Sequence, residues 1–97
     1  MYVVRNVFEC KPGKAGELAE KMRAAGPHLA EVGIVNRRIL TDTAAGFWTV
    51  VVETEVENVA DYFEALGRRS DNPALAEAMA GYMDLVTGGR REIWQLR

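Results

Sequence analysis

Four segments of the chain are rich in β-branched and aromatic residues, and we predict that each forms a strand. They are Tyr2–Cys10, Gly33–Thr41, Phe47–Glu55 and Arg90–Leu96. The second and third are separated by five residues, Asp42–Gly46, a loop length typical of an antiparallel hairpin. The pattern therefore predicts four strands, two of them joined in a hairpin.

Apolar residues at helical spacing follow the first strand and predict an amphipathic helix. We expect this helix to run from about Lys14 to Ala25 and to stop at Gly26-Pro27. Glycine favours the helix cap, and proline cannot continue the hydrogen-bond ladder. The single histidine, His28, would then be an exposed residue of the following connector.

Two further helices are predicted in the second half of the chain. Asn58 is expected to cap the first of them, and Gly67 to stop it. Asn72-Pro73 is a cap followed by proline at the first helical position, and Gly88-Gly89 is expected to end that helix. Their predicted apolar faces are Val59, Phe63 and Leu66 for one, and Leu75, Met79, Tyr82, Met83 and Val86 for the other.

The resulting order is β-α-β-β-α(α)-β, which is the split βαβ, ferredoxin-like arrangement. This order predicts one α+β domain over residues 1–97, with a four-stranded antiparallel sheet and helices on one face. No linker or low-complexity tract divides the chain. A length of 97 residues is also that of a single domain.

The predicted strands do not alternate cleanly between apolar and polar residues, so both faces of the sheet contain apolar side chains. In the third strand one face consists of Trp48, Val50 and Val52, and the other of Phe47, Thr49, Val51 and Glu53. An apolar sheet face needs a cover, and the predicted helices suffice for only one. We therefore expect a homodimer in which the uncovered faces of two sheets pack together.

Charge and cysteine content exclude several classes of function. Twelve basic and fourteen acidic residues give a net charge of −2, which argues against nucleic-acid binding. Cys10 is the sole cysteine, and no residue spacing supports a metal site. The first residues do not show the pattern of a signal peptide, no apolar run is long enough to span a bilayer, and we expect a cytoplasmic location. Nucleophilic triads, phosphate-binding loops and dinucleotide-binding glycine patterns are absent.

Polar residues on the predicted strands are candidates for binding a ligand. Asn6 lies between apolar neighbours, where asparagine is disfavoured, so it faces a pocket or is a satisfied interface residue. Glu53 shares a face with Thr49, and it is either a base with a raised pKa or the partner of an arginine in an ion pair. Arg37 and Arg38 must point to opposite faces, and Arg38 is taken as the candidate.

Large aromatic residues supply a further candidate. Trp94 and Trp48 are the largest side chains on the strands, and Tyr2 and Tyr82 are placed to join them. Together they would line a cavity for a planar ligand, or they pack in the core. No residue is assigned a catalytic role.

Several segments together resemble the dimeric α+β-barrel superfamily. They are the strand ending in Cys10-Lys11-Pro12-Gly13-Lys14, the helix after it, the glycine-containing second strand, and Gly88-Gly89-Arg90-Arg91-Glu92-Ile93-Trp94. Within the superfamily the chain is similar to antibiotic biosynthesis monooxygenases and to NIPSNAP-like proteins. The resemblance implies that Asn6 points into a pocket. It disfavours haem degradation, because the histidine and tryptophan of the haem-degrading relatives have no counterpart between Asn58 and Val86.

Two functions remain open at this stage. The resemblance implies a small monooxygenase that needs no cofactor and binds an aromatic or polyketide-like ligand in the barrel. In such an enzyme Asn6 would hold an oxygen atom, and Glu53 or a tyrosine would move a proton. The alternative is a non-catalytic dimeric α+β barrel that serves as a binding or stress-associated module.

Overall fold

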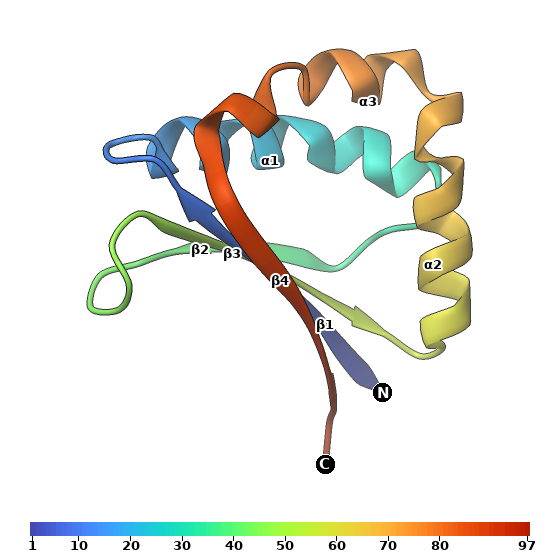
Figure 1. The fold of residues 1–97 in the computed structure, drawn as a ribbon. Helices are drawn as coiled ribbons and strands as arrows, with labels where there is room; N and C mark the ends of the chain where they lie inside the picture. The colour runs from blue at the N-terminus through green and yellow to red at the C-terminus, as the bar shows by residue number, and fades with distance from the viewer.

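The computed structural model describes residues 1–97 and contains the elements in the predicted order (Figure 1). One sheet is covered by helices, and the chain termini lie close together at one end of it. The elements are β1 (Tyr2–Cys10), α1 (Ala15–Glu31), β2 (Arg37–Thr41), β3 (Thr49–Val56), α2 (Val59–Gly67), α3 (Pro73–Ala78) and β4 (Val86–Gln95), with short 3₁₀ helices η1 (Arg68–Asp71) and η2 (Tyr82–Leu85).

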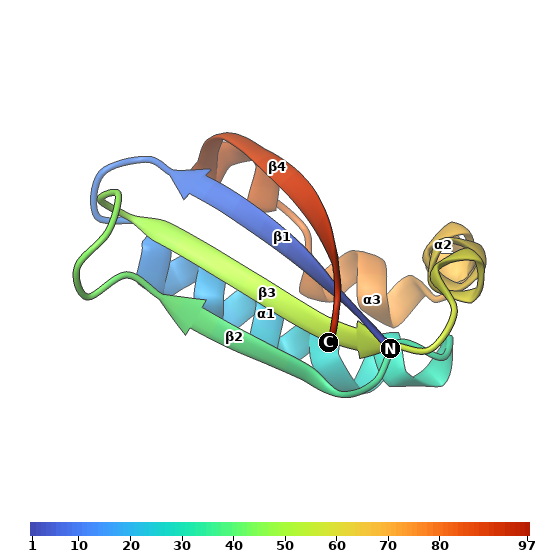
Figure 2. The same cartoon turned by 90° about the horizontal axis from the view of Figure 1, so that it is seen from below.

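The sheet is antiparallel throughout, with strand order β2-β3-β1-β4. This is the predicted ferredoxin-like topology, and the β2–β3 hairpin is confirmed. Figure 2 shows α1 running behind β2 and β3 and the other helices lying on the same side. We call this side the helix face and the opposite side the open face. None of the helices is long and apolar enough to cross a membrane.

The hydrophobic core lies between the sheet and the helices. Its largest fully buried side chains are Val4, Leu18 and Val50. One cluster packs α1 against β3 around Leu18, and a smaller one joins β1 to α2 through Val4 and Tyr62. The core therefore fixes α1 and α2 on the same face of the sheet.

The predicted stop of the first helix is wrong, because α1 continues through Gly26 and Pro27 to Glu31. Proline at this position removes one helical hydrogen bond. Packing offsets that cost: the segment beyond the predicted stop places Leu29 against the second core cluster. His28 is consequently a half-buried residue of the last turn and not an exposed loop residue, and its Nδ1 has no hydrogen-bond partner.

The predicted face of α2 is only partly correct. Leu66 packs against the second core cluster as expected, but the buried residues are Tyr62 and Ala65, and Phe63 is 42 % exposed. The cap was predicted correctly, since Asn58 Oδ1 accepts hydrogen bonds from the backbone N–H groups of Ala60 and Asp61. The cap fixes where α2 begins, and long-range packing selects the face that it buries.

The predicted third helix is shorter than expected. Asn72 caps α3 as predicted, but α3 ends at Ala78 and the chain turns at Gly81 with φ +81°. Gly88-Gly89 lies inside β4 and is not a helix cap. A Cβ atom on Gly89 would lie 2.6 Å from the Val7 carbonyl oxygen, so glycine is needed there for the close approach of β4 to β1.

The third strand begins two residues later than predicted. Phe47 is 83 % exposed at the hairpin tip, and Trp48 has a left-handed φ of +53°. The loop is held by Thr49, whose backbone N–H donates to Asp42 Oδ1 at 2.7 Å. The left-handed turn interrupts the strand alternation at Trp48, so the predicted grouping of Trp48 with Val50 and Val52 does not hold.

Candidate functional site

The strand register divides the five candidate residues between the two faces of the sheet. Residues paired across antiparallel strands point to the same face. Asn6 pairs with Val52, which is buried against α1, so Asn6 lies on the helix face. Arg38 pairs with Glu53, and Glu53 alternates with Val52, so both lie on the open face. The predicted barrel site with Asn6 and Glu53 in one cavity is therefore not formed.

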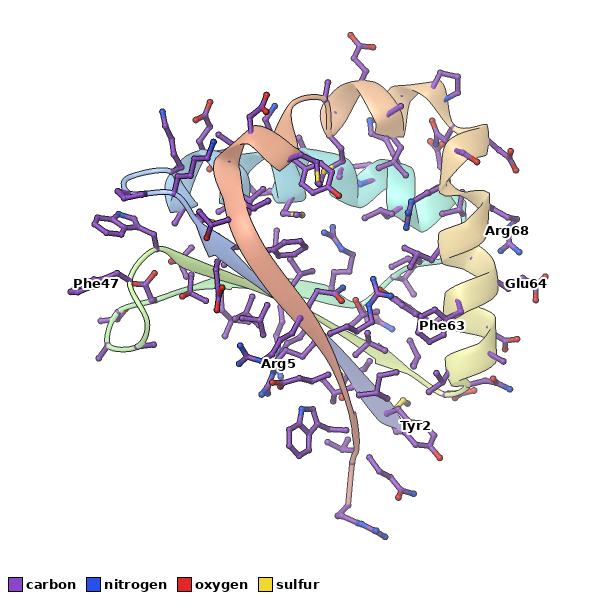
Figure 3. The ribbon with its side chains drawn as sticks, viewed as in Figure 1. Tyr2, Arg5, Phe47, Phe63, Glu64 and Arg68 are labelled. Carbon is purple, nitrogen blue, oxygen red and sulfur yellow. The ribbon has the colours of Figure 1, made fainter.

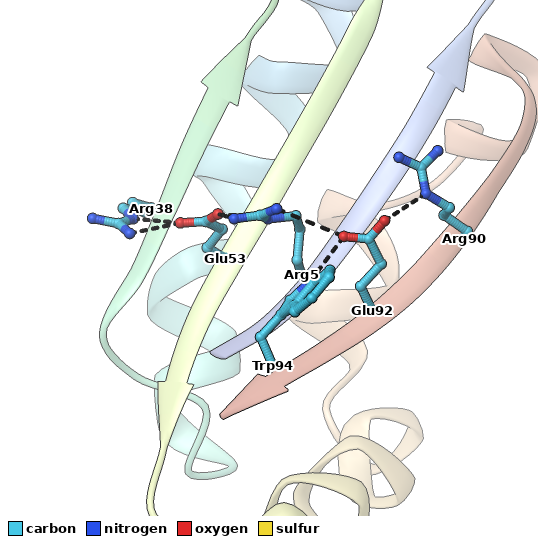
Figure 4. Close-up of polar contacts among 6 residues, drawn as sticks. All are labelled: Arg5, Arg38, Glu53, Arg90, Glu92 and Trp94. Atoms are coloured by element: carbon cyan, nitrogen blue, oxygen red, sulfur yellow. Dashed lines mark hydrogen bonds and ion pairs between the residues drawn. The ribbon is translucent and has the colours of Figure 1, made fainter. Parts of the chain in front are cut away.

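Five charged residues cross the open face as a continuous row, which we call the charge ladder (Figure 4). Glu53 accepts hydrogen bonds from Arg38 and from Arg5, at 2.7 Å each. Arg5 also lies 3.6 Å from Glu92, and Arg90 Nε lies 2.7 Å from Glu92. The ladder thus alternates in sign across all four strands, with each carboxylate between two guanidinium groups.

The charge ladder keeps Glu53 ionised. Burial by itself would raise the pKa of Glu53, but the hydrogen bonds and charges of Arg38 and Arg5 outweigh burial and lower it below its ordinary value. A carboxylate with a lowered pKa is a weak proton acceptor at neutral pH. Of the two roles open to Glu53, the structure shows the ion pair.

The other open-face candidates also make contacts within the chain. Trp94 donates from Nε1 to Glu92 Oε1 at 3.0 Å, and it is 55 % exposed. Thr49 donates from its hydroxyl to the Gly46 carbonyl at 2.7 Å. Trp94 lies opposite Val3 in the β1–β4 ladder, near the start of β1. The Trp48 carbonyl accepts a hydrogen bond from the Cys10 N–H, at the other end of β1. The two tryptophans therefore line no common cavity. In Figure 3, Phe47, the neighbour of Trp48, lies well apart from Tyr2, the neighbour of Val3.

A polar cluster on the helix face surrounds Asn6. Its Nδ2 donates to the Tyr62 hydroxyl at 3.3 Å, and its Oδ1 accepts from Arg91 Nε at 2.7 Å. The Arg91 guanidinium carbon lies 5.4 Å from the ring centre of Phe63 and 5.9 Å from that of Tyr62. Phe63 projects from α2 on the side of the sheet (Figure 3). We call Asn6, Tyr62, Phe63 and Arg91 the Asn6 cluster.

The Asn6 cluster combines groups that recognise an oxygen-bearing aromatic molecule. Arg91 supplies a permanent positive charge and further N–H donors. It has no carboxylate within ion-pair distance, in contrast to the arginines of the charge ladder. Phe63 and Tyr62 provide aromatic surface beside this charge. The cluster can therefore bind an anionic oxygen on a planar ligand.

Three members of the cluster, Tyr62, Phe63 and Arg91, were not predicted from the sequence as site residues. Arg91 was placed in the fourth strand without a functional role, although it pairs directly with Asn6 across β1 and β4. Tyr62 was assigned to no face because Val59, Phe63 and Leu66 fit the helical period. The sequence did contain a signal for Arg91. If the fourth strand pairs with the first, Arg91 can lie opposite Asn6 in the middle of the first strand.

Neither family models nor curated proteins match the sequence, but solved structures do. Protein Atu4242 from Agrobacterium tumefaciens superposes with a TM-score of 0.85 at 12 % identity, over 100 % of this chain and 94 % of that one. A NIPSNAP domain protein from Burkholderia xenovorans gives 0.83 at 12 % identity, over 100 % and 95 %. A candidate antibiotic biosynthesis monooxygenase from Chloroflexus aurantiacus gives 0.75 at 11 % identity, over 99 % and 93 %.

These likenesses extend over nearly the full length of each chain. They confirm at the level of fold the resemblance to NIPSNAP-like and antibiotic biosynthesis monooxygenase-like proteins. Identities of 11–12 % do not carry an activity from one protein to another. The chain shares the ferredoxin-like fold of these two groups of proteins.

Proposed function

We propose that this protein is a small monooxygenase that needs no cofactor and acts on a hydroxylated aromatic or polyketide-like molecule. The observation that carries the proposal is the Asn6 cluster, in which a carboxamide, a phenol and an unpaired guanidinium meet on the helix face. The same fold in candidate antibiotic biosynthesis monooxygenases supports the reaction class.

The chemistry follows from the groups present. An oxygenase without a cofactor needs a substrate that supplies its own electrons, and a phenolate or enolate is such a substrate. Arg91 stabilises the anionic oxygen, because its permanent positive charge and its N–H donors lower the energy of a negative charge beside them. Asn6 Nδ2 donates a hydrogen bond to the same oxygen or to its neighbour. The Tyr62 hydroxyl, 3.3 Å from Asn6, is the group placed to relay the proton.

The proposed reaction balances without an external reductant. A methylene group between two aromatic rings and one molecule of O₂ give a ring ketone and one molecule of water. One oxygen atom forms the new C=O bond, and the other leaves as water with the two methylene hydrogens. The four electrons that O₂ accepts come from the two C–H bonds that break. The protein holds the anion and its proton and supplies no redox group.

We also propose that the chain forms a homodimer through the open face. The apolar side chains Leu40, Val51 and Trp94 lie there around the charge ladder. Because the ladder pairs its charges within one chain, covering it leaves no carboxylate without a partner, which reduces the cost of desolvation. Sedimentation at micromolar concentration tests this proposal: we expect dimers, and a strictly monomeric species would contradict it.

Oxygen uptake tests the proposed activity. With a panel of anthrones and quinols as substrates, we expect uptake by the wild type and a loss of about 100-fold or more in Asn6→Ala and Arg91→Gln. Arg90→Gln is the matched control, because Arg90 neighbours Arg91 on β4 but faces the open side. Equal rates in all four proteins would remove Asn6 and Arg91 from the reaction.

A non-catalytic dimeric binding module is the second candidate, and one observation favours it. Neither Asn6 nor Arg91 lines any of the three surface grooves, although Phe63 lines one of them and Tyr62 another. The Arg91 side chain itself lies against Asn6 and the aromatic rings. A protein of this second kind would form dimers but show no oxygen uptake with any member of the panel.

A further inference from the structure

The largest of these three grooves lies between α1 and the edge strand β2, away from the Asn6 cluster. Its volume is about 580 Å³, which is within the range of sites for small molecules. α1 lines one side, β2 the other, and the residues between them close one end. The lining residues are Arg23, Gly26, Pro27, Ala30, Ile34, Val35, Asn36, Arg37 and Ile39.

Arg37 is the unusual residue of this groove. It lies on the helix face, is half-buried, and donates from Nη1 to the Met22 carbonyl at 3.2 Å. Its side chain makes no other hydrogen bond and no ion pair, although a guanidinium carries five N–H donors. Its neighbour Arg38, on the opposite face, is paired with Glu53 at 2.7 Å. Arg37 therefore has donors and a charge that the chain leaves uncompensated.

The backbone of α1 makes room for this guanidinium. A Cβ atom on Gly26 would lie 3.3 Å from Arg37 Nη1, closer than an ordinary contact. Glycine in a helix interior costs about 1 kcal/mol relative to alanine, and Pro27 adds a further cost. Gly26 and Pro27, the two residues of α1 least suited to a helix, thus lie where the Arg37 side chain passes this helix. Burial lowers the pKa of Arg37 below its ordinary value.

No carboxylate lines the groove, and its polar lining residues besides Arg37 are Asn36 and Arg23. Pro27, Ala30, Ile34, Val35 and Ile39 form its walls. The second arginine, Arg23, is paired with Glu20 and lies at the exposed surface. A cation without a partner in an apolar groove is stabilised by an anion whose remaining surface is apolar.

We propose that the groove between α1 and β2 binds a small amphipathic carboxylate, with its head group on Arg37 and its apolar part along Pro27, Ala30 and Ile39. Carboxylate geometry suits the planar guanidinium, which can donate two parallel hydrogen bonds. The groove shares no residue with the Asn6 cluster. This binding site is therefore independent of the proposed oxygenase activity.

Nuclear magnetic resonance with two probes tests the proposal on the unmodified protein. The probes are octanoate and its uncharged analogue, methyl octanoate. We expect octanoate to shift the backbone amides of Ala30, Val35, Arg37 and Ile39 in a saturable way, and the ester to bind at least 10-fold more weakly. Equal affinity for acid and ester, or octanoate shifts centred on the Asn6 cluster, would overturn the proposal.

Variants sharpen the assignment to Arg37. Arg37→Gln should weaken octanoate binding at least 10-fold, whereas Arg38→Gln, the matched change on the opposite face, should leave it within about two-fold. Gly26→Ala retains the charge and improves helix propensity, so it should fold, yet its Cβ displaces the guanidinium and should weaken binding. Unchanged binding in both Arg37→Gln and Gly26→Ala would overturn the proposal, whatever the oxygen-uptake assays give.

Discussion

The two faces of the sheet treat their arginines differently. On the open face, Arg5, Arg38 and Arg90 are all paired with carboxylates in the charge ladder. On the helix face, Arg37 and Arg91 have no carboxylate partner and contact a backbone carbonyl, an amide and aromatic rings. Both faces belong to the same four strands. Residues two positions apart along a strand point to the same face.

This difference separates structural charges from charges available to a ligand. A guanidinium in an ion pair has its donors occupied, so it stabilises the sheet or an interface. An unpaired guanidinium beside apolar surface has donors left for an anion. The open face is therefore suited to packing against a second chain, and the helix face to binding small molecules.

Removing core packing should show the largest difference between the faces. Leu18→Ala removes a fully buried side chain from the helix face and should lower the free energy of unfolding by about 2–5 kcal/mol. Leu40→Ala alters an open-face residue that is 43 % exposed and should cost less than about 1 kcal/mol at low chain concentration.

Urea unfolding at several chain concentrations measures both effects. In the proposed dimer Leu40 contacts a second chain, so the loss in Leu40→Ala should grow with concentration, whereas the loss in Leu18→Ala should not. A Leu40→Ala loss that equals that of Leu18→Ala at every concentration would show that the open face is core within one chain.

Breaking the charge ladder should have an intermediate effect. Glu53→Gln leaves Arg5 and Arg38 without their shared carboxylate and should cost about 1–3 kcal/mol. This is less than for a fully enclosed pair, because both guanidinium groups remain in contact with water. Urea unfolding at pH 7 gives the value, and a loss below the error of the measurement would contradict a structural role for the ladder.

The pH dependence of this loss has a definite sign. The pKa of Glu53 is lowered in the folded protein below its ordinary value of 4.5. Its contribution to stability is therefore fully present above about pH 4.5 and is lost as the pH falls through the lower, folded-state value. The difference in unfolding free energy between wild type and Glu53→Gln should shrink on acidification below pH 4.5. A difference that grows on acidification would contradict a lowered pKa of Glu53 in the folded protein.

Neutralising an unpaired arginine should have the smallest effect on stability. Arg91→Gln loses one hydrogen bond to Asn6 and its contacts with the aromatic rings, a cost of about 1 kcal/mol or less. Its effect on ligand binding should nevertheless exceed that of Arg90→Gln on the open face. Thermal unfolding measures the effect on stability, and ligand titration on the same samples measures the effect on binding. Unchanged ligand affinity in Arg91→Gln would remove the distinction drawn between the faces.

Local signals in the sequence were sufficient for the order of the strands and helices along the chain and for two helix starts. Asn58 and Asn72 were predicted as caps because capping involves only residues two or three positions apart, and both bonds are present. The five-residue loop predicted the hairpin for the same reason. These features depend on short-range geometry, which the sequence carries directly.

Features that depend on distant neighbours were not predictable from local rules. Gly26-Pro27 reads as a helix stop, yet α1 continues because Leu29 packs on the core and Arg37 occupies the space beside Gly26. Gly88-Gly89 reads as a cap, yet Gly89 is required where β4 approaches the Val7 carbonyl. In each case a contact made far along the chain outweighs the local preference.

The candidate site shows the same division. Asn6 was recognised from its neighbours in one strand, but its partners Tyr62 and Arg91 are 56 and 85 residues away. For Glu53 the sequence left open a base or an ion-pair partner, and the structure shows the ion pair. The separation of Asn6 from Glu53 follows only from the register of β1 and β3. A single residue suggested the site, and the strand pairing determined its composition.

The claim that the helix face is the ligand side is tested most directly by mapping a bound aromatic molecule. A hydroxyanthraquinone, the air-stable product of the proposed reaction, would be titrated into the isotope-labelled protein while backbone amide resonances are recorded. We predict saturable shifts at Asn6, Tyr62, Phe63 and Arg91. Shifts confined to Arg38, Val51 and Trp94 on the open face, or no saturable shift at any residue, would contradict the claim.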